Sequence, residues 1–211
     1  MRKIKIALTL VIGVGLFCST LSAKGKSNLS VMDKLIKGNQ KYQSFNPTHP
    51  DQSKRRLAEV YKGQHPMAVV VSCSDSRVSP ELIFDQGVGD LFVIRTAGHA
   101  VSEYELASIE YAVEHLHCKE IIVLGHEKCG AIQTFIEHSN DSLPKHLNHL
   151  IDYLRHEEEE KDPLKHHNVK EAILANILHT SKLIKNNFEP DEVNVHSMYY
   201  NLVTGKVEEI H

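Results

Sequence analysis

The sequence has little excess charge and no long apolar run. Its 211 residues carry a formal net charge of −3. The chain is mildly acidic, and its basic clusters, such as residues 54–56, are short. Such a chain is a poor partner for nucleic acid. The most apolar stretch, at 6–17, is too short to cross a membrane, because a spanning helix needs about 20 residues. With 41% hydrophobic residues, the composition instead favours one ordinary globular domain.

The N-terminal segment accounts for that apolar stretch in another way. Residues 1–5 are basic, 6–17 are nearly all apolar, and 19–23 are mostly small. This order is typical of a secretory signal peptide, with Ala23 as the best small residue at the boundary. We therefore expect an exported, periplasmic protein in which residues 24–211 form one domain, with no membrane association after processing. Cleavage near Ala23 removes three positive charges and no negative ones, which moves the net charge to −6.

Cysteine is also scarce. Of the four cysteines, one lies in the expected signal peptide, which leaves Cys73, Cys118 and Cys129. An odd number of cysteines in an oxidising compartment argues against a disulfide framework. A bound metal is the usual alternative partner for such sulfurs.

Continuous apolar runs predict a parallel sheet. Residues 67–72, 91–94 and 120–124 are almost entirely apolar and do not alternate, as expected of strands that are buried on both faces. Between the last two runs, apolar residues recur at spacings of three and four, which predicts a helix. These residues are Leu106, Ile109, Val113 and Leu116. The order strand, helix, strand predicts an α/β fold with right-handed crossovers.

The remaining pattern adds helices and a closing hairpin. A helical arm is expected at 30–44, before the first strand. Further helices are expected at 53–62, 130–138, 144–157 and 167–186. Residues 193–202 and 206–210, joined by a turn at Thr204 and Gly205, are typical of a hairpin.

Metal-binding side chains follow two of the predicted strands. Cys73 follows the first strand, and His126 and Cys129 follow the third. Because neighbouring parallel strands lie about 4.8 Å apart and end at one edge, these three residues can share one ion. If a helix begins at His126, the three-residue spacing also places His126 and Cys129 on one side of its first turn. Two thiolates and an imidazole favour zinc, and three protein ligands leave a fourth position for water, which is typical of a catalytic site.

An acidic and a basic residue follow the first of these cysteines. Two thiolates offset the charge of zinc, so other groups must help to activate the bound water. Asp75 can accept a hydrogen bond from that water, and the planar guanidinium of Arg77 can hold the carboxylate in place. A surface ion pair by itself contributes little, but these two residues lie close to a metal ligand. We therefore expect a catalytic dyad.

These motifs resemble the β-class carbonic anhydrases. The family signature, C-x-D-x-R followed by H-x-x-C, is intact at 73–77 and 126–129. The resemblance covers nearly all of 30–210 and includes the stretches 81–85 and 89–95. It implies a sheet of four parallel strands with an added edge strand, flanked by helices, plus the N-terminal arm. It also implies one zinc ion per chain and a homodimer or homotetramer in which the arm wraps the partner.

The resemblance implies a role for each matching residue. The zinc ligands fall on Cys73, His126 and Cys129, and the dyad falls on Asp75 and Arg77. The implied substrate pocket consists of Gln64, Phe92, Ala97, Tyr111 and Gly130. An apolar wall beside the metal suits CO2, which has no charge and little dipole.

Three positions depart from patterns of this family. Members that close the site by moving the aspartate onto zinc bind bicarbonate in a side pocket, using a tryptophan and a glycine just before the first cysteine. Val70 and Ser72 occupy those places, and the chain has no tryptophan. We therefore expect an open site in which Arg77 holds Asp75 away from the metal. His99 stands where many bacterial members have asparagine, and a structural role is favoured there over proton shuttling.

The sequence therefore predicts the reversible hydration of CO2 to bicarbonate and a proton. Two alternatives stay open. One is an enzyme of the same scaffold that acts on CS2 or COS, and it would need a remodelled tunnel to the zinc. The other is a non-catalytic protein that binds zinc or bicarbonate. The absence of Asp75 or Arg77 would favour this alternative, but both residues are present.

Overall fold

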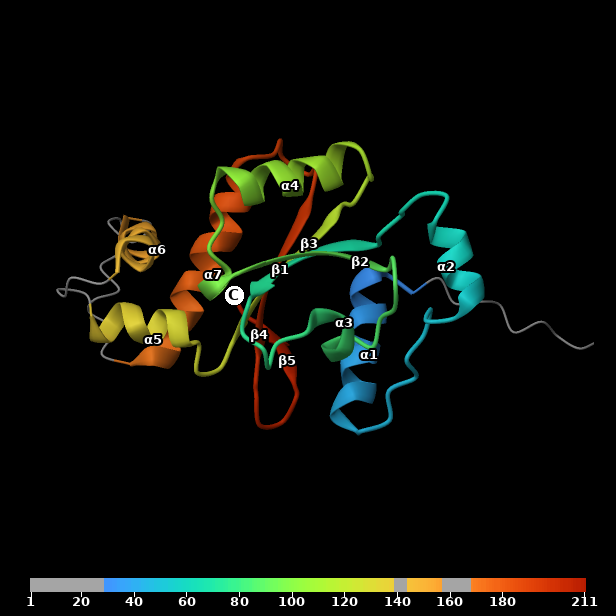
Figure 1. The fold of residues 1–211 in the computed structure, drawn as a ribbon, viewed down its shortest axis with the longest axis horizontal. Helices are drawn as coiled ribbons and strands as arrows, with labels where there is room; N and C mark the ends of the chain where they lie inside the picture. Colours follow the sequence, from blue (N-terminus) through green and yellow to red (C-terminus); the bar gives the residue numbers. More distant parts are fainter. Residues whose placement is uncertain (1–28, 139–143, 157–167) are drawn as a thin grey trace, which may run out of the picture.

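A five-stranded sheet forms the centre of the protein (Figure 1). The computed structural model describes residues 29–138, 144–156 and 168–211. The strand order is β2-β1-β3-β4-β5; the first four strands are parallel, and β5 pairs antiparallel with β4 at the edge. The strands are β1 (Ala68–Cys73), β2 (Leu91–Thr96), β3 (Glu120–His126), β4 (Asn194–Tyr200) and β5 (Val207–Glu209). The expected sheet of four parallel strands with an added edge strand is confirmed.

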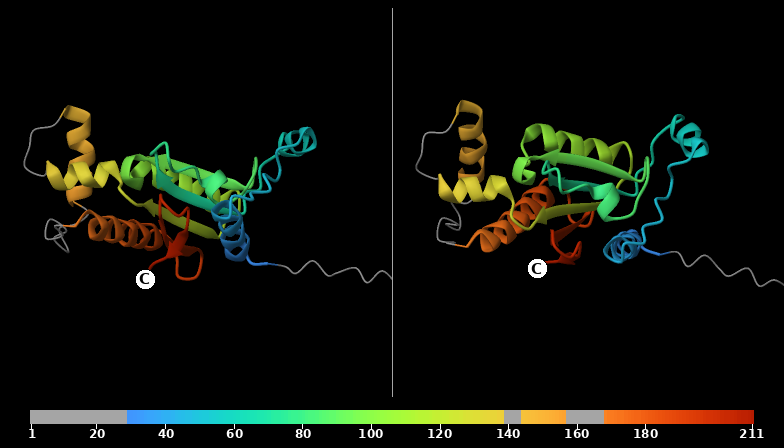
Figure 2. Two further views of the ribbon diagram at one scale, coloured as in Figure 1. Left: turned by 90° about the horizontal axis from the view of Figure 1, so that it is seen from below. Right: turned by 60° about the horizontal axis from the view of Figure 1, so that its bottom comes forward.

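Helices cover both faces of this sheet. In chain order they are α1 (Val31–Gln43), α2 (Lys54–Val60), α3 (Pro80–Ile83), the 3-10 turn η1 (Ala97–His99), α4 (Glu103–Glu114), α5 (Gly130–Glu137), α6 (Lys145–His156) and α7 (Val169–Asn186). α4 and α7 pack on one face, and α1 and α3 pack on the other. Figure 2 shows α5 and α6 side by side at one end of the sheet, next to α7.

Strand β1 is buried along its whole length. Val69 and Val71 belong to the core under α4 and α7, whereas Ala68 and Val70 belong to the core under α1 and α3. Successive side chains of a strand point to opposite faces, so a strand between two helical layers needs apolar residues at every position. This explains the continuous apolar run.

The predicted helices and hairpin are present, with two additions. α1 confirms the arm at 30–44, and β4 with β5 confirms the closing hairpin. α3 and η1 were not predicted, because elements of three or four residues have no measurable periodicity. The expected signal peptide and residues 157–167 lie outside the described residues. In the described part of the chain, no helix is long and apolar enough to span a membrane.

α1 is fixed to the sheet by close packing and by one buried amide. A Cβ atom on Gly38 would lie 1.7 Å from the Phe84 carbonyl oxygen, so only glycine lets α1 approach α3 this closely. Asn39 donates to the carbonyl oxygens of Ile83 and Gly205, at 3.1 and 2.8 Å, and accepts from the Val207 backbone N–H at 2.9 Å. The arm is therefore joined to both α3 and the C-terminal hairpin.

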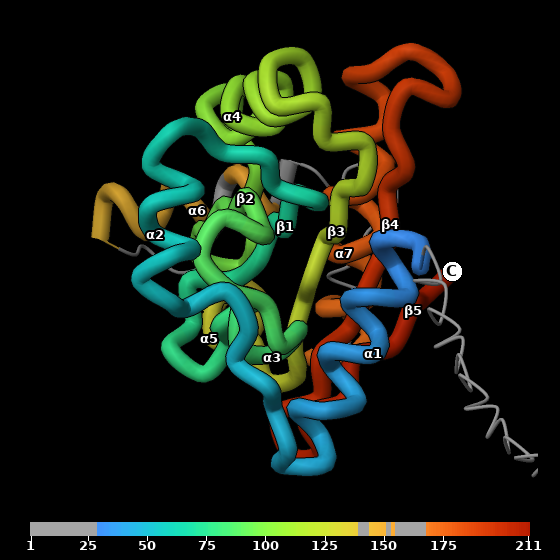
Figure 3. Tube along the Cα trace, turned by 90° about the vertical axis from the view of Figure 1, so that its right-hand side faces the viewer, coloured from blue at the N-terminus to red at the C-terminus, as the bar shows by residue number. Residues whose placement is uncertain are grey.

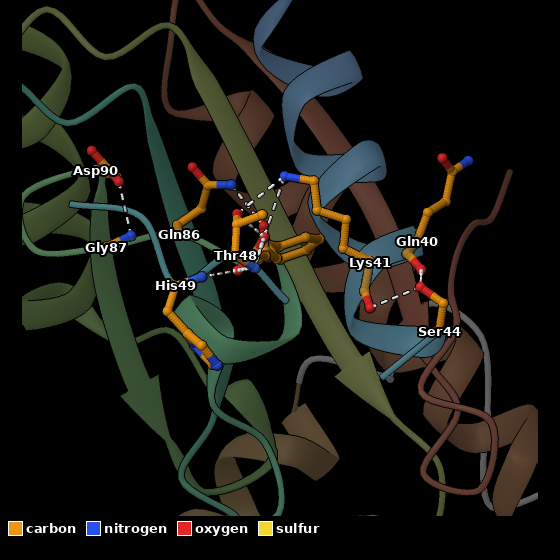
Figure 4. A network of polar contacts seen from close by, with 10 residues as sticks. Gln40, Lys41, Ser44, Thr48, His49, Gln86, Gly87 and Asp90 are labelled. Carbon is orange, nitrogen blue, oxygen red and sulfur yellow. Dashed lines mark hydrogen bonds and ion pairs between the residues drawn. The ribbon is translucent and has the colours of Figure 1, made fainter. Parts of the chain in front are cut away.

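A buried carboxylate holds the loop that follows α1. Asp85 accepts hydrogen bonds from the backbone N–H groups of Thr48 and His49 at 2.9 Å, and from the Thr48 hydroxyl at 2.6 Å. Lys41 Nζ adds a contact of 3.4 Å from α1. Figure 4 shows Lys41, Thr48 and His49 gathered around this point. We call this set of contacts the Asp85 network.

α2 projects from the helical layers (Figure 2). It has no buried residue. Arg56 attaches it to the chain just before β2, by donating to the Val88 carbonyl and to Asp90, both at 2.8 Å. Figure 3 shows α2 near the β2 side of the sheet and α1 near β4 and β5. The chain from α1 to α2 therefore runs from one side of the sheet to the other.

Candidate metal centre

Cys73, His126 and Cys129 converge at the carboxyl edge of the sheet. Cys73 ends β1, His126 ends the neighbouring strand β3, and Cys129 directly precedes α5. Their ligand atoms all lie within 4.8 Å of one another, and all three side chains are buried. No other group of three His, Cys, Asp or Glu side chains converges in this way among the residues that the structure describes. The predicted convergence is therefore present, and we call these residues the triad.

The path from His126 to Cys129 differs from the one expected. No helix begins at His126, because this residue still belongs to β3. Lys128 adopts a left-handed conformation with φ of 51°, and α5 begins only at Gly130. The two side chains therefore meet across a tight turn. The expectation of a shared helical turn was wrong, although it placed both residues at the same site.

The hydrogen bonding of His126 leaves one ring nitrogen for a metal. Nδ1 lies 2.9 Å from the Glu127 carbonyl oxygen, which can only accept, so Nδ1 carries the proton. Nε2 then presents a lone pair, and this buried atom has no hydrogen-bond partner within the described structure. Because an unpaired buried polar atom costs free energy, the arrangement indicates a missing ligand. This is the tautomer in which histidine binds zinc through Nε2.

The two sulfurs are arranged to hold negative charge. A hydrogen bond from the Cys129 thiol lowers the pKa of Cys73, and the same bond raises the pKa of Cys129, since the pair shares one proton. The backbone N–H groups of Asp75 and Gly98 also donate to Cys73 Sγ, each at 3.4 Å. These donors stabilise a thiolate, which is the form that binds metal.

Asp75 and Arg77 form a bidentate pair beside the triad. Arg77 Nε donates to Asp75 Oδ1 at 2.9 Å, and Arg77 Nη2 donates to Oδ2 at 2.7 Å. These hydrogen bonds hold the pKa of Asp75 well below its usual range, so the carboxylate stays ionised. Asp75 Oδ2 lies 4.0 Å from His126 Nε2. Arg77 also donates to the Lys128 carbonyl at 3.2 Å, and thereby joins the loops that follow β1 and β3.

Two further residues support the backbone around Cys73, and sequence reasoning gave a role to neither. Arg95 donates to the carbonyl oxygens of Cys73 and Asp75, at 3.1 and 2.8 Å. Asn176 on α7 donates to the Gly98 carbonyl at 2.9 Å. Arg95 lies in a stretch that resembles the family, which was a usable signal. Asn176 lies between apolar residues of a helix, and no motif marks it.

His99 is fully buried behind the triad. Burial lowers the pKa of His99 to about 4, so the imidazole is neutral near neutral pH. Its Nε2 lies 2.8 Å from the Asn176 side-chain nitrogen. A buried, neutral ring held by another side chain supports the structural role that we favoured for this residue over proton shuttling.

Two residues of the predicted substrate pocket lie beside the triad. Ala97 follows Thr96, which is the β2 partner of Cys73, and Gly130 follows Cys129. Both residues are exposed. A Cβ atom on Gly130 would meet no atom within 4 Å, so there is open space at this rim of the site.

The other three predicted pocket residues lie elsewhere in the chain. Phe92 and Tyr111 pack together with ring centroids 6.3 Å apart. Phe92 pairs with Val69, four residues before Cys73, which corresponds to roughly 13 Å along the strand. Gln64 is exposed and precedes β1, at the opposite end from Cys73. Within one chain, the structure does not bring these three residues to the triad.

The fold and the triad together define a class of protein. A family model described as carbonic anhydrase matches residues 68–207, and the chain therefore belongs to the carbonic anhydrase family. The solved structure of the β-carbonic anhydrase CcaA is similar with a TM-score of 0.63 at 32% identity, covering 83% of this chain and 86% of that one. This match places the chain in the β class.

Named relatives match different shares of the chain. Carbonic anhydrase 2 of Mycobacterium tuberculosis is 49% identical over 111 residues, which is 52% of this chain and 54% of that protein. The chain thus spans about half the length of that relative. The carbonic anhydrase of Synechococcus elongatus is 31% identical over 200 residues, 85% of this chain and 71% of that protein. A tetrameric β-carbonic anhydrase of Sordaria macrospora shares the fold, with a TM-score of 0.64 at 23% identity over 83% of this chain and 94% of that one.

Proposed function

We propose that this protein catalyses the reversible hydration of CO2 to bicarbonate and a proton, with one zinc ion per chain. The observation that carries the proposal is the convergence of three buried ligand atoms, one of which, His126 Nε2, has no hydrogen-bond partner in the described structure. Relatives that are named carbonic anhydrases support the same reaction.

The donor set fits zinc. Two sulfurs and an imidazole nitrogen are typical zinc ligands, whereas magnesium and calcium select oxygen. Ligand atoms within 4.8 Å of one another can contact one ion with bonds of roughly 2.0–2.3 Å after little movement. Cys73, His126 and Cys129 would hold the ion. When bound, zinc would act as a Lewis acid that lowers the pKa of a bound water, so that hydroxide is available near neutral pH.

Asp75 orients the attacking oxygen in this proposal. An ionised carboxylate can only accept hydrogen bonds, so a water or hydroxide beside Asp75 directs its hydrogen to the carboxylate and its lone pair away from it. The position of Asp75 Oδ2, 4.0 Å from His126 Nε2, places the acceptor next to the triad. Arg77 engages both carboxylate oxygens and so keeps Asp75 from becoming a fourth metal ligand. The site is then open to water.

We also propose that the protein is a homodimer or homotetramer. Gln64, Phe92 and Tyr111 lie away from the triad of their own chain, so a pocket that includes them requires a second chain. Helix α2, which has no buried residue, is suited to pack on that partner. The structural neighbour from Sordaria macrospora is described as tetrameric. Light scattering of the purified protein tests this, and a stable monomer that remains fully active would overturn it.

We further propose export to the periplasm with cleavage near Ala23, on the strength of the basic, apolar and small-residue segments. N-terminal sequencing of the protein from cells should begin near Lys24. Recovery of the protein with Met1 in place would contradict export by cleavage.

Stopped-flow CO2 hydration combined with metal analysis tests the proposed reaction. We expect about one zinc per chain and hydration well above the uncatalysed rate, lost on chelation and restored by added zinc. Zinc binding without hydration would favour the non-catalytic alternative. Faster turnover of COS or CS2 than of CO2 would favour the same-scaffold hydrolase.

A further inference from the structure

Asn176 is a buried amide on the buried face of α7, which it shares with apolar residues and with the hydroxyl residues Thr180 and Ser181. Its side chain is 4% exposed and lies between Ile173 and Ile177, which are both in the core. Burying an amide without hydrogen bonds is unfavourable, because its bonds to water are lost. Asn176 donates instead to the Gly98 carbonyl at 2.9 Å and lies 2.8 Å from His99 Nε2. Both partners belong to η1, nearly 80 residues earlier in the chain.

The Gly98 contact fixes the orientation of the amide and the tautomer of His99. A carbonyl oxygen can only accept, so the Asn176 atom that faces Gly98 must be the nitrogen. The same nitrogen then donates its second hydrogen to His99 Nε2. His99 is therefore the neutral tautomer with its proton on Nδ1. One amide thus holds two consecutive residues of η1.

The second of these residues needs to be held, because the backbone of His99 is strained, whereas glycine adopts such a conformation freely. Gly98 and His99 both adopt left-handed conformations, with φ of 66° and 49°. A non-glycine residue in this region is disfavoured and persists only when its surroundings fix it. Asn176 is the side chain on α7 that supplies this restraint.

The restrained 3-10 turn η1 supplies a hydrogen-bond donor to the proposed metal ligand Cys73. The Gly98 N–H donates to Cys73 Sγ at 3.4 Å. A hydrogen bond to a ligand sulfur withdraws negative charge from it, which matters in a site where two thiolates offset the charge of one zinc ion. The chain of contacts therefore runs from α7 through η1 to Cys73, and none of its members except Cys73 is a metal ligand in our proposal.

We infer that Asn176 is a positioning residue for the metal centre: by holding Gly98 and His99, it keeps the Gly98 N–H on the sulfur of Cys73. This inference rests on the proposed zinc site. It assigns a task to a buried amide of α7 that contacts η1, and it explains why a histidine is accommodated at position 99.

The test compares Asn176→Leu with a control on the same helix. Asn176→Leu keeps the branched shape and the number of side-chain heavy atoms and removes both donors. Thr180→Val, one turn further along α7, changes a residue that is 1% exposed and whose hydroxyl has no hydrogen-bond partner in the described structure. Zinc affinity of the full chain is measured by competition with a chromophoric chelator. We expect Asn176→Leu to bind Zn2+ roughly 10-fold or more weakly, and Thr180→Val to bind it like the unmutated chain.

A spectroscopic readout separates positioning from a general loss of stability. In Co2+-substituted protein, the thiolate-to-metal charge-transfer band reports the charge on the sulfurs. Loss of the Gly98 donor makes Cys73 more electron-rich, so the band should move to longer wavelength in Asn176→Leu and stay in place in Thr180→Val. Asn176→Ser, which is too short to reach both partners, should show the same shift if the leucine variant does not fold.

A double-mutant cycle with His99→Phe adds a second check. If both residues act through η1, the losses of zinc affinity in Asn176→Leu and His99→Phe should not add in the double variant. An unchanged zinc affinity and an unmoved cobalt band in folded Asn176 variants would overturn the positioning role alone. An unmutated chain that neither binds zinc nor hydrates CO2 would instead overturn the proposed function.

Discussion

The Asp85 network and the triad are both buried polar clusters, yet they are satisfied in opposite ways. The Asp85 side chain has no exposed surface, and Thr48, His49 and Lys41 supply donors to its oxygens. At the triad, His126 Nε2 has no partner in the described structure, and two sulfurs share one proton. The first cluster is completed by the chain itself. The second leaves its lone pairs converging on one point.

This difference separates a structural cluster from a functional one. Buried polar groups are nearly always hydrogen-bonded, because an unpaired group forfeits its bonds to water. A fold in which an unpaired, buried imidazole nitrogen converges with two sulfurs therefore depends on something outside the chain to complete it. At the carboxyl edge of this sheet, that completion is the proposed zinc ion.

The largest effect should come from removing a ligand of the triad. Cys73→Ser replaces a thiolate with a hydroxyl, which is a poor zinc ligand at neutral pH, so both bound zinc and CO2 hydration should be lost. Metal analysis and stopped-flow hydration on the same sample check this. Zinc content equal to that of the unmutated protein would show that the triad is not the metal site.

Arg77→Ala should strongly reduce activity but leave the metal bound. Without the guanidinium, Asp75 becomes an unpaired carboxylate next to a cation and should move onto the zinc, which lowers kcat/KM roughly 100-fold or more. Arg77→Lys keeps the charge without the bidentate geometry, so its kcat/KM should lie between those of Arg77→Ala and the unmutated protein. Full activity in Arg77→Ala would mean that Arg77 is not required to keep Asp75 away from the metal.

Changing the Asp85 network should affect stability and not zinc. Asp85→Asn puts an amide among N–H donors and should reduce the free energy of unfolding at neutral pH by about 1–3 kcal/mol, with the zinc content unchanged. Although burial raises the pKa of Asp85, the hydrogen bonds from Thr48, His49 and Lys41 outweigh it and leave the pKa lowered.

The sign of that pKa shift gives a pH dependence. A carboxyl whose pKa is lowered on folding stabilises the fold above its unfolded pKa, about 3.9, and this contribution is lost as the pH falls through the folded value. The stability difference between the unmutated protein and Asp85→Asn should therefore narrow below about pH 4. Urea unfolding over a pH series measures it, with the exposed Asp191→Asn as control. A difference that stays constant down to acid pH would contradict the assignment.

The smallest effect should come from Cys118→Ser. Cys118 is 2% exposed, lies before the amino end of β3 and donates to the Pro66 carbonyl at 3.1 Å, a bond that serine can also make. We expect full hydration activity, one zinc per chain and a change in unfolding free energy within about 1 kcal/mol. Loss of hydration in a folded Cys118→Ser protein would place this cysteine in the site.

Most of the fold could be predicted because its core is recorded in short-range patterns. The apolar run before Cys73 predicted a strand buried on both faces. The helix expected at 167–186 is α7, in which Ile173, Ile177 and Ile184 form one apolar stripe. η1 could not be predicted, because its left-handed residues are held by Asn176 on a distant helix. Propensity acts within a few residues, whereas such a restraint acts through the tertiary fold.

The candidate site divides in the same way. Its ligands follow strand ends, so their convergence could be predicted from the topology of parallel sheets. The turn at Lys128 could not, because H-x-x-C spacing is compatible with a helix or a tight turn. The supporting hydrogen bonds of Arg95 and Asn176 depend on which backbone atoms the finished fold places beside them. The spacing therefore located the centre, and only the structure showed what surrounds it.

A crystal structure of the zinc-loaded, unmutated protein at mildly alkaline pH, with anomalous scattering to locate zinc, tests the central claim most directly. The account predicts one zinc ion on Cys73 Sγ, His126 Nε2 and Cys129 Sγ, with both oxygens of Asp75 still held by Arg77. Zinc bound elsewhere, or Asp75 coordinating the zinc in every chain, would contradict it.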